Sequence, residues 1–232
     1  MLKRILQRIY PQNCVLCGAS SASEAGLCVD CQADLLANPT ACARCALPLA
    51  AASRHLLCGQ CLQKGPVFDA AWSPFIYAQP LEWMIHQLKF NGRLLYAKWL
   101  AELACKQLPQ LDEIPDCILP VPLHPSRLRA RGFNQALELA RPLARALSLP
   151  LDSRHCRRLI HTSPQTGMDA KQRRKNIRGA FSFENPAAYD YVVVFDDVIT
   201  TGSTVSELAR VIKREGVRRV DVWSLARADK SW

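Results

Sequence analysis

The sequence contains no long apolar run. Nowhere in its 232 residues do eighteen apolar residues follow one another, so we expect no membrane-spanning helix. The first ten residues interleave leucine and isoleucine with lysine and arginine, and they lack the continuous apolar core of a secretory signal. We therefore expect a cytoplasmic protein, in a compartment where structural disulfides are rare.

Acidic and aromatic side chains are also scarce. Asp and Glu number 20 against 30 Lys and Arg, and the resulting formal net charge of +10 favours an anionic partner. Aromatic residues make up 7% of the chain, and we expect most of the tryptophans to lie in the core. The tryptophans are scattered, at Trp72, Trp83, Trp99, Trp223 and Trp232. The sequence therefore shows no evident aromatic platform on which a nucleobase could stack.

Cysteine, in contrast, is abundant, with 11 in the chain. Eight of them form four Cys-x-x-Cys pairs, namely Cys14/Cys17, Cys28/Cys31, Cys42/Cys45 and Cys58/Cys61. Two such pairs supply the four thiolates of a tetrahedral zinc site, so we predict two structural zinc ions without an open coordination position. The first two pairs could share one ion and the last two the other, and a cross-braced arrangement fits the same spacing. Disulfides and redox pairs are the alternatives, disfavoured by the compartment and by the lack of a surrounding strand–helix–strand pattern.

These cysteines define a small N-terminal module, which we place at residues 11–65. The module has few large apolar residues, so we expect it to depend on its metal for folding. Turn signals at Lys64-Gly65-Pro66 mark the predicted boundary, and residues 66–232 would form the main domain. Acidic and basic residues nearly balance within the module, so the excess positive charge belongs to the main domain.

The most informative stretch of the main domain reads VVVFDDVITTGST. Its apolar start, Val192–Phe195, indicates a strand buried on both faces, as in a parallel sheet. Asp196 and Asp197 follow, and then come a hydroxyl-rich loop and a helix with Thr204 and Glu207 at capping-box spacing. The N–H groups of such a loop and of the helix N-terminus favour a phosphate. The expected phosphate-binding residues are Val198, Ile199, Thr200, Thr201, Gly202, Ser203 and Thr204.

Asp196 and Asp197 stand beside this expected phosphate site, where two carboxylates need a different kind of partner. Carboxylates accept hydrogen bonds from neighbouring ribose hydroxyls, and their hard oxygens suit Mg²⁺. Acids followed by a phosphate loop therefore suggest a ribose 5-phosphate.

Further cations are candidates for holding a diphosphate. Arg127, Arg129 and Arg131 follow a predicted buried strand at 116–122, in a segment that we expect to be a loop, because arginines two apart are no helix-surface pattern. Guanidinium groups bind phosphate through paired hydrogen bonds, so we assign Arg127 and Arg131 to the diphosphate, with a solvated loop as the alternative. Lys89, near the end of a predicted helix, either caps that helix or reaches a phosphate.

A basic segment runs from Arg154 to Arg178, with eight Lys and Arg residues and a single acid. Such a surface can follow a nucleic-acid backbone, and we assign this role to Arg173, Arg174, Lys175 and Arg178. The alternatives are a mobile loop that closes over a diphosphate and a solvated charged helix.

The remaining patterns predict an α/β fold, with a parallel sheet flanked by helices. We expect a strand or hairpin over 68–77, interrupted by Pro74, and helices over 81–90, 93–108 and from about 135 to 147. Ligands of open α/β sheets bind at the carboxyl ends of the strands, where both predicted phosphate segments would lie.

The Asp-Asp and Thr-Thr-Gly-Ser-Thr sequence closely resembles the phosphoribosyl-diphosphate (PRPP) motif of type I phosphoribosyltransferases. Further motifs precede it in the order seen in the ComF/GntX family, which also carries an N-terminal zinc module. These motifs are Arg131-Gly132-Phe133-Asn134-Gln135, Thr162 with Gln165, Arg173 with Asn176, and Gly179-Ala180-Phe181. The resemblance extends from about Cys14 to Ala226. It implies a type I phosphoribosyltransferase-like fold with a double zinc ribbon and a role in competence, the uptake of DNA for transformation.

Three interpretations of function stay open. In a phosphoribosyltransferase, Asp196 and Asp197 would bind ribose directly or through Mg²⁺, while Arg127 and Arg131 stabilise the departing diphosphate. In a competence protein, the same pocket would recognise a phosphorylated ribose or a DNA end, and the basic segment would hold imported single-stranded DNA. In a regulatory module, PRPP would be a signal, and the zinc module would contact a partner such as a competence helicase or another DNA-processing protein. The resemblance favours the second, and the sequence contains no recognisable pocket for an acceptor base.

Overall fold

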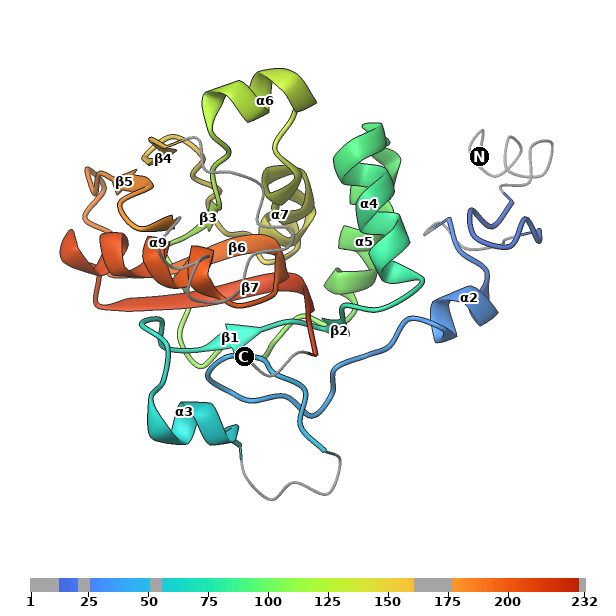
Figure 1. Ribbon diagram of the computed structural model, residues 1–232, viewed down its shortest axis with the longest axis horizontal. Coiled ribbons are helices and arrows are strands. Elements are labelled where there is room, and N and C mark those ends of the chain that lie inside the picture. Colours follow the sequence, from blue (N-terminus) through green and yellow to red (C-terminus); the bar gives the residue numbers. More distant parts are fainter. Residues whose placement is uncertain (1–12, 21–25, 51–55, 161–176, 230–232) are drawn as a thin grey trace.

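The computed structural model describes residues 13–20, 26–50, 56–160 and 177–229 of the chain. Its centre is a parallel sheet with helices on both faces, and the cysteine-rich segments lie along the edge formed by β1 and β2 (Figure 1). In chain order the elements are α2 (Val29–Ala33), α3 (Gly59–Gln63), β1 (Ala71–Trp72), β2 (Phe75–Ile76), α4 (Leu81–Asn91), α5 (Leu95–Cys105), β3 (Cys117–Pro120), α6 (Pro125–Arg131), α7 (Gln135–Ala146), β4 (Cys156–Arg158), β5 (Phe181–Phe183), β6 (Tyr191–Ile199), α9 (Ser203–Arg214) and β7 (Arg219–Arg227).

The sheet is built around its two nine-residue strands, β6 and β7. The strand order is β1–β7–β6–β3, with β2 also beside β7, and all these pairs are parallel. The predicted strand or hairpin over 68–77 is therefore one edge strand in two pieces, because Pro74 between them has no N–H to donate. Parallel strands end at a common edge, and the carboxyl ends of β3 and β6 lie side by side there.

Alternation along β6 divides the hydrophobic core in two. Successive side chains of a strand point to opposite faces. Val193 and Phe195 belong to the cluster that contains α4, α5 and α7, whereas Val192 and Val194 belong to the cluster that contains α9. All four side chains are fully buried, which stabilises the fold by roughly 1.5–3 kcal/mol each. The prediction of a strand buried on both faces is confirmed.

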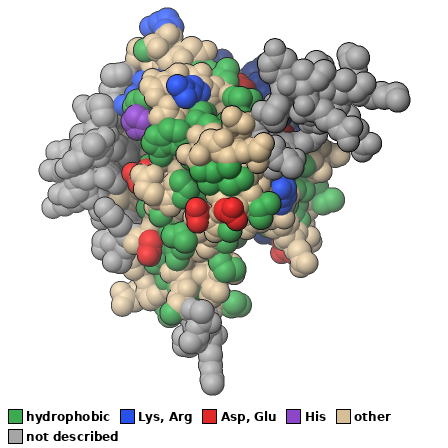
Figure 2. Space-filling model, turned by 90° about the vertical axis from the view of Figure 1, so that its right-hand side faces the viewer, with side chains coloured by type: hydrophobic (Ala, Val, Ile, Leu, Met, Phe, Trp, Pro, Cys, Tyr) green, Lys and Arg blue, Asp and Glu red, His purple; other side chains and the backbone are tan. Residues whose placement is uncertain are grey.

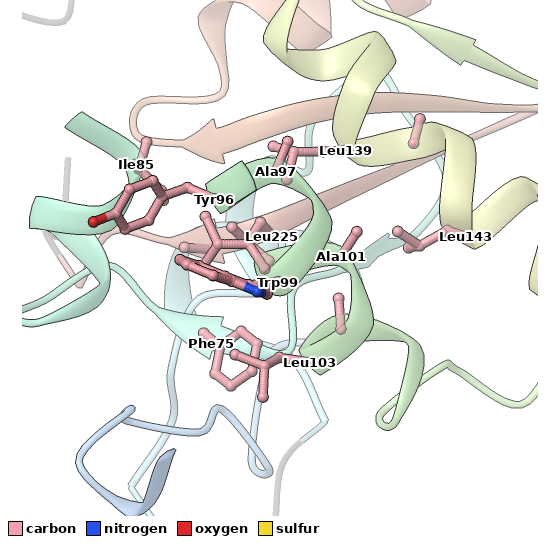
Figure 3. Close-up of a cluster of buried hydrophobic side chains, with 14 of the residues drawn as sticks. Phe75, Ile85, Tyr96, Ala97, Trp99, Ala101, Leu103, Leu139, Leu143 and Leu225 are labelled. Carbon is pink, nitrogen blue, oxygen red and sulfur yellow. The ribbon is translucent and has the colours of Figure 1, made fainter. Parts of the chain in front are cut away.

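Helix α5 fills the first of these clusters (Figure 3). Tyr96 and Trp99 of α5 pack edge to face, with ring centroids 5.3 Å apart, and they lie beside Leu225 of β7. On its other side α5 faces Leu139 and Leu143 of α7. The three helices predicted over 81–90, 93–108 and 135–147 are confirmed as α4, α5 and α7, with ends that differ by up to three residues.

The segment that carries the three arginines is helix α6, and the predicted loop is wrong. His124 caps the helix by accepting a hydrogen bond from the Ser126 N–H at 3.3 Å, and Pro125 occupies the first turn. A capping side chain and a proline there both favour a helix start. Residues four apart share a helix face, so Arg127 and Arg131 lie together, whereas Arg129 is exposed.

The start of α9 also differs from the prediction. The helix begins at Ser203 after Gly202, whose φ of 67° suits glycine, so Thr204 is no capping residue. Glu207, the expected second half of the capping box, is buried instead. It accepts a hydrogen bond from the Gly179 N–H at 2.9 Å and forms an ion pair with Arg210.

Figure 2 shows the face of the molecule on the side of α4. Hydrophobic side chains lie across its middle, and the Lys and Arg side chains drawn there stand apart from one another. The described part of this face is therefore no continuous basic surface. Within the residues that the structure describes, no helix is both long enough and apolar enough to cross a lipid bilayer.

Candidate functional site

The eight paired cysteines form two separate clusters in sequence order, which excludes the cross-braced pairing. In each cluster the four Sγ atoms all lie within 4.8 Å of one another. The Sγ–Sγ distance is 3.6 Å between Cys17 and Cys28 and 3.7 Å between Cys45 and Cys58. Tetrahedral zinc with Zn–S bonds of about 2.3 Å would place its sulfurs about 3.8 Å apart. The first cluster contains Cys14, Cys17, Cys28 and Cys31, and the second contains Cys42, Cys45, Cys58 and Cys61.

Main-chain N–H groups favour the thiolate form that zinc requires. The Cys58 N–H donates to the Sγ of Cys42 at 3.3 Å, and the Cys31 N–H donates to the Sγ of Cys28 at 3.4 Å. Burial alone would raise the pKa of Cys14 and Cys42, but hydrogen bonds from nearby N–H groups lower it to about 6 and about 7. The two clusters therefore fit two structural zinc sites, each with four sulfur ligands and no place for water.

Each cluster packs into a different part of the main domain. The first shares its hydrophobic core with α5, and a Cβ atom added at Gly26 would lie 2.2 Å from the Trp99 ring. The second shares its core with Phe68 and with Ile199 at the end of β6. The second cluster is therefore the one that lies next to the predicted phosphate loop.

A cavity of about 740 Å³ opens at the carboxyl end of β6. Its lining brings together three segments that are far apart in the sequence: the last turn of α4, one face of α6, and the loop between β6 and α9. All the predicted phosphoribose-site residues line it, namely Lys89, Arg127, Arg131, Asp196, Asp197, Val198, Ile199, Thr200, Thr201, Gly202, Ser203 and Thr204.

A polar network joins α4, α6, α7 and the end of β6 at the floor of this cavity. Asp197 is buried and forms an ion pair with the Lys89 ammonium. It also accepts a hydrogen bond from the Gln135 amide at 3.2 Å, and Gln135 in turn accepts one from the Arg131 guanidinium. In this structure Lys89 therefore neutralises an acid of the site rather than capping its helix.

The two adjacent acids have opposite pKa shifts. Burial and the neighbouring Asp197 carboxylate raise the pKa of Asp196 well above its usual value. Burial acts in the same direction on Asp197, but the Lys89 ammonium holds the pKa of Asp197 below its usual value. Asp197 is thus neutralised by its ion pair with Lys89. Among the described residues, Asp196 accepts a hydrogen bond from the Asp197 N–H at 2.8 Å and forms no ion pair.

The loop after β6 has the form of an anion site. The Oγ atoms of Thr201 and Ser203 lie 2.8 Å apart, and both residues line the cavity. The first N–H groups of a helix have no partner within the helix, so the twelve-residue α9 presents donors and partial positive charge at its N-terminus. Hydroxyl groups and N–H groups together suit a phosphate.

Several cavity residues were not predicted as part of this site. Arg158 is buried on β4 with its guanidinium 5.5 Å from the centroid of the Phe181 ring, and burial together with the Arg127 charge lowers its pKa. In β4, Cys156 and Arg158 are buried and Arg157 between them is exposed, as expected for a strand. Three residues are too few for this alternation to predict from the sequence that Arg158 is buried. The other unpredicted residues of the lining include Tyr77, Glu82, Phe90 and Gln135.

Most of the residues that we predicted to bind nucleic acid lie outside the part of the chain that the structure describes. Arg173, Arg174 and Lys175 lie outside the described residues. Arg178 is exposed and lines a second cavity of about 610 Å³, between α3 and α9. This second cavity shares Ile199, Thr201, Gly202 and Ser203 with the first, so the phosphate loop separates the two.

Comparison with solved structures finds a weak likeness to adenine phosphoribosyltransferase from Leishmania tarentolae. The alignment covers 60% of this chain and 74% of that chain, with a TM-score of 0.29 and 13% sequence identity. A likeness at this level supports no conclusion about function.

The sequence comparisons cover nearly the whole chain. Residues 5–62 match the double zinc ribbon domain, which agrees with the two cysteine clusters and confirms the predicted α/β fold with an N-terminal zinc-ribbon module. DNA utilization protein YhgH from Escherichia coli O157:H7 is 39% identical over 94% of this chain and 97% of its own length. Competence protein F from Haemophilus influenzae is 36% identical over 96% of this chain and 100% of its own length. The chain therefore belongs to the family of competence protein F and YhgH, the ComF/GntX family that its motifs indicated.

Proposed function

We propose that this protein binds a phosphorylated ribose, PRPP or a close relative, in the cavity at the carboxyl end of β6. The observation that carries the proposal is the convergence of α4, α6 and the β6–α9 loop on one cavity with an acid pair at its floor. Each group has a matching part in the ligand. The loop and the α9 N-terminus suit the 5-phosphate, the acids suit the ribose hydroxyls, and Arg127, Arg131 and Arg158 suit a diphosphate.

The acid pair also fits Mg²⁺. Asp196 has a raised pKa because burial and Asp197 disfavour its charge, and a hard cation is one partner that would restore the carboxylate. When bound, Mg²⁺ would offset the negative charge of a diphosphate. The protein's own contribution is to hold Asp197 charged through Lys89 and to keep Asp196 facing the same cavity.

The biological role that we propose is the handling of imported single-stranded DNA in the cytoplasm during natural transformation. The names of the relatives, competence protein F and DNA utilization protein, support this role. The basic segment that contains Arg173, Arg174 and Lys175 and ends at Arg178 would hold the DNA backbone, while the cavity recognises a phosphorylated sugar. A competence helicase or another DNA-processing protein is the expected kind of partner.

Catalysis of phosphoribosyl transfer is a second candidate function. Three arginines around the cavity supply more positive charge than a single 5-phosphate needs, as binding and release of a diphosphate would require. Release of diphosphate from PRPP in the presence of nucleobases would support this candidate. PRPP that stays intact while bound would leave binding as the function.

The proposal is tested by titrating PRPP, with and without Mg²⁺, into the wild type and Asp196→Asn. This substitution leaves the Lys89–Asp197 ion pair in place, so the fold should survive. We expect affinity to fall about tenfold or more, since a charge-assisted contact is worth roughly 1.5–3 kcal/mol. Glu184→Gln makes the same chemical change at an exposed residue outside the cavity lining and should leave affinity unchanged. A wild-type protein that binds neither PRPP nor ribose 5-phosphate would refute the proposal.

A further inference from the structure

A fully buried arginine connects the second cysteine cluster to the phosphate loop. Arg227 is the last residue of β7, and its side chain is 0% exposed. Its Nε donates a hydrogen bond to the carbonyl oxygen of Cys45 at 3.0 Å. Its Nη1 donates to the carbonyl oxygens of Ile199 at 3.1 Å and Thr200 at 2.7 Å. One rigid guanidinium thus holds the main chain of a cluster cysteine and that of the loop at the same time.

The electrostatics favour this placement when the cluster holds zinc. Burying a guanidinium charge is unfavourable unless negative charge or dipoles compensate for it. Two charges on zinc against four thiolates leave a formal charge of about −2 on the second cluster. Arg227 also donates to the carbonyl dipoles of Cys45, the loop and Ala228. The metal-loaded cluster is therefore the state in which Arg227 is best stabilised in its observed position.

The hydrogen bonds of Arg227 also fix the direction of the loop N–H groups. A trans peptide is planar, so its C=O and N–H point in opposite directions. Arg227 lines the 610 Å³ cavity and is not among the residues that line the 740 Å³ cavity. Because it attracts the carbonyl groups of Ile199 and Thr200, the N–H groups of Thr200 and Thr201 turn away from it. Thr200 and Thr201 both line the 740 Å³ cavity, so N–H groups that point away from Arg227 would be available to a phosphate bound there.

We propose that Arg227 is a positioning residue through which the zinc of the second cluster sets the phosphate-binding loop. The inference rests on the proposed function, since it concerns the same phosphate site. Loss of zinc from the second cluster would release Cys45, weaken the hold of Arg227 on the loop and lower the affinity for a phosphorylated ribose. The first cluster packs against α5 in the other hydrophobic core and provides an internal comparison.

The test compares Arg227→Met with Arg219→Met in the full-length, zinc-loaded protein. Both substitutions remove a guanidinium from β7, but Arg219 lies at the opposite end of the strand and binds Asp221 at 2.9 Å. Both variants should keep two zinc ions. We expect ribose 5-phosphate affinity to fall about tenfold in Arg227→Met alone, in the range typical of coupled sites. Equal affinity losses in the two variants would reduce Arg227 to a general contributor to stability and overturn the inference.

A second experiment measures the rate at which a chelator removes zinc instead of the affinity for the sugar phosphate. Coupling is reciprocal, so a bound phosphorylated ribose should strengthen zinc binding at the second cluster. In the wild type, ribose 5-phosphate should slow the removal of one of the two zinc ions by a chelator, and in Arg227→Met it should slow neither. If the wild type binds ribose 5-phosphate but both zinc ions leave at unchanged rates, the coupling is absent. If the wild type binds no sugar phosphate, the proposed function fails and the inference fails with it.

Discussion

Asp196 and Asp197 are adjacent in sequence, yet their environments give them opposite effects on stability. Asp197 has its charge compensated by Lys89, so Asp197→Asn would leave a largely buried ammonium without its partner. We expect this substitution to lower the free energy of unfolding by about 3 kcal/mol. Burial and the Asp197 carboxylate disfavour the charge of Asp196, so Asp196→Asn should raise the free energy of unfolding by roughly 0.5–2 kcal/mol at pH 7. Chemical denaturation of the two single variants measures both signs, and the same sign in both would contradict this account.

The effect of Asp196 should also depend on pH in a defined direction. Its pKa is raised in the folded state, so between the unfolded value of about 3.9 and the folded value the native protein binds more protons. The free energy of unfolding of the wild type therefore falls with rising pH over this window, so the extra stability of Asp196→Asn relative to the wild type grows. Melting curves of the two proteins from pH 5 to pH 8 test this. An advantage that shrinks as the pH rises would refute the assigned shift.

The two zinc ribbons should need their metal ions in order to stay folded. Helices α2 and α3 have five residues each, too short to be stable alone, and each contains a cluster cysteine. We expect two zinc ions per reduced chain by elemental analysis, and hydrogen exchange should show that chelation unfolds both ribbons while α5 and α7 stay protected. One zinc per chain would mean that one of the clusters has a different role.

Local sequence signals identified some elements well and misjudged others for physical reasons. The apolar run of β6 and the cysteine spacing are strong signals, because burial and tetrahedral sulfur ligation each impose a definite pattern. The short helix α6 was missed because its cap, His124, is not a typical capping residue. The capping box at Thr204 was wrong because Glu207 accepts a tertiary hydrogen bond from the Gly179 N–H and forms an ion pair with Arg210 of its own helix.

At the scale of the whole molecule, the sequence predicted which residues form the candidate site but not how they are supported. Arg131 was assigned to the diphosphate, and Lys89 was a candidate for a phosphate. Only the fold shows that Lys89 contacts Asp197 directly and that Arg131 is connected to it through Gln135. Arg227 carries no sequence signal at all, because its role depends on contacts with residues 182 and 28 positions away.

DNA binding by the basic segment should be separable from PRPP binding in the cavity. If the basic segment binds single strands, log K should fall with log salt by about 0.7 per phosphate neutralised. Replacing Arg173, Arg174 and Lys175 with Ala should weaken DNA binding, flatten that slope by roughly two units and leave PRPP affinity intact. Fluorescence anisotropy with an oligonucleotide at two salt concentrations, beside a PRPP titration, separates this from a closing loop. Lost PRPP affinity with unchanged DNA affinity would assign the segment to the cavity instead.

The packing of the two ribbons into different hydrophobic cores has a consequence for dissecting the protein. A truncated chain starting at residue 66 would keep every residue that lines the 740 Å³ cavity. It would nevertheless uncover Trp99 on one side and Phe68 on the other, and it would remove the Cys45 carbonyl group, one of those that Arg227 binds. Newly exposed apolar surface of this kind promotes aggregation. The sugar-binding half is thus a separate region of sequence whose apolar surface is covered by the two ribbons.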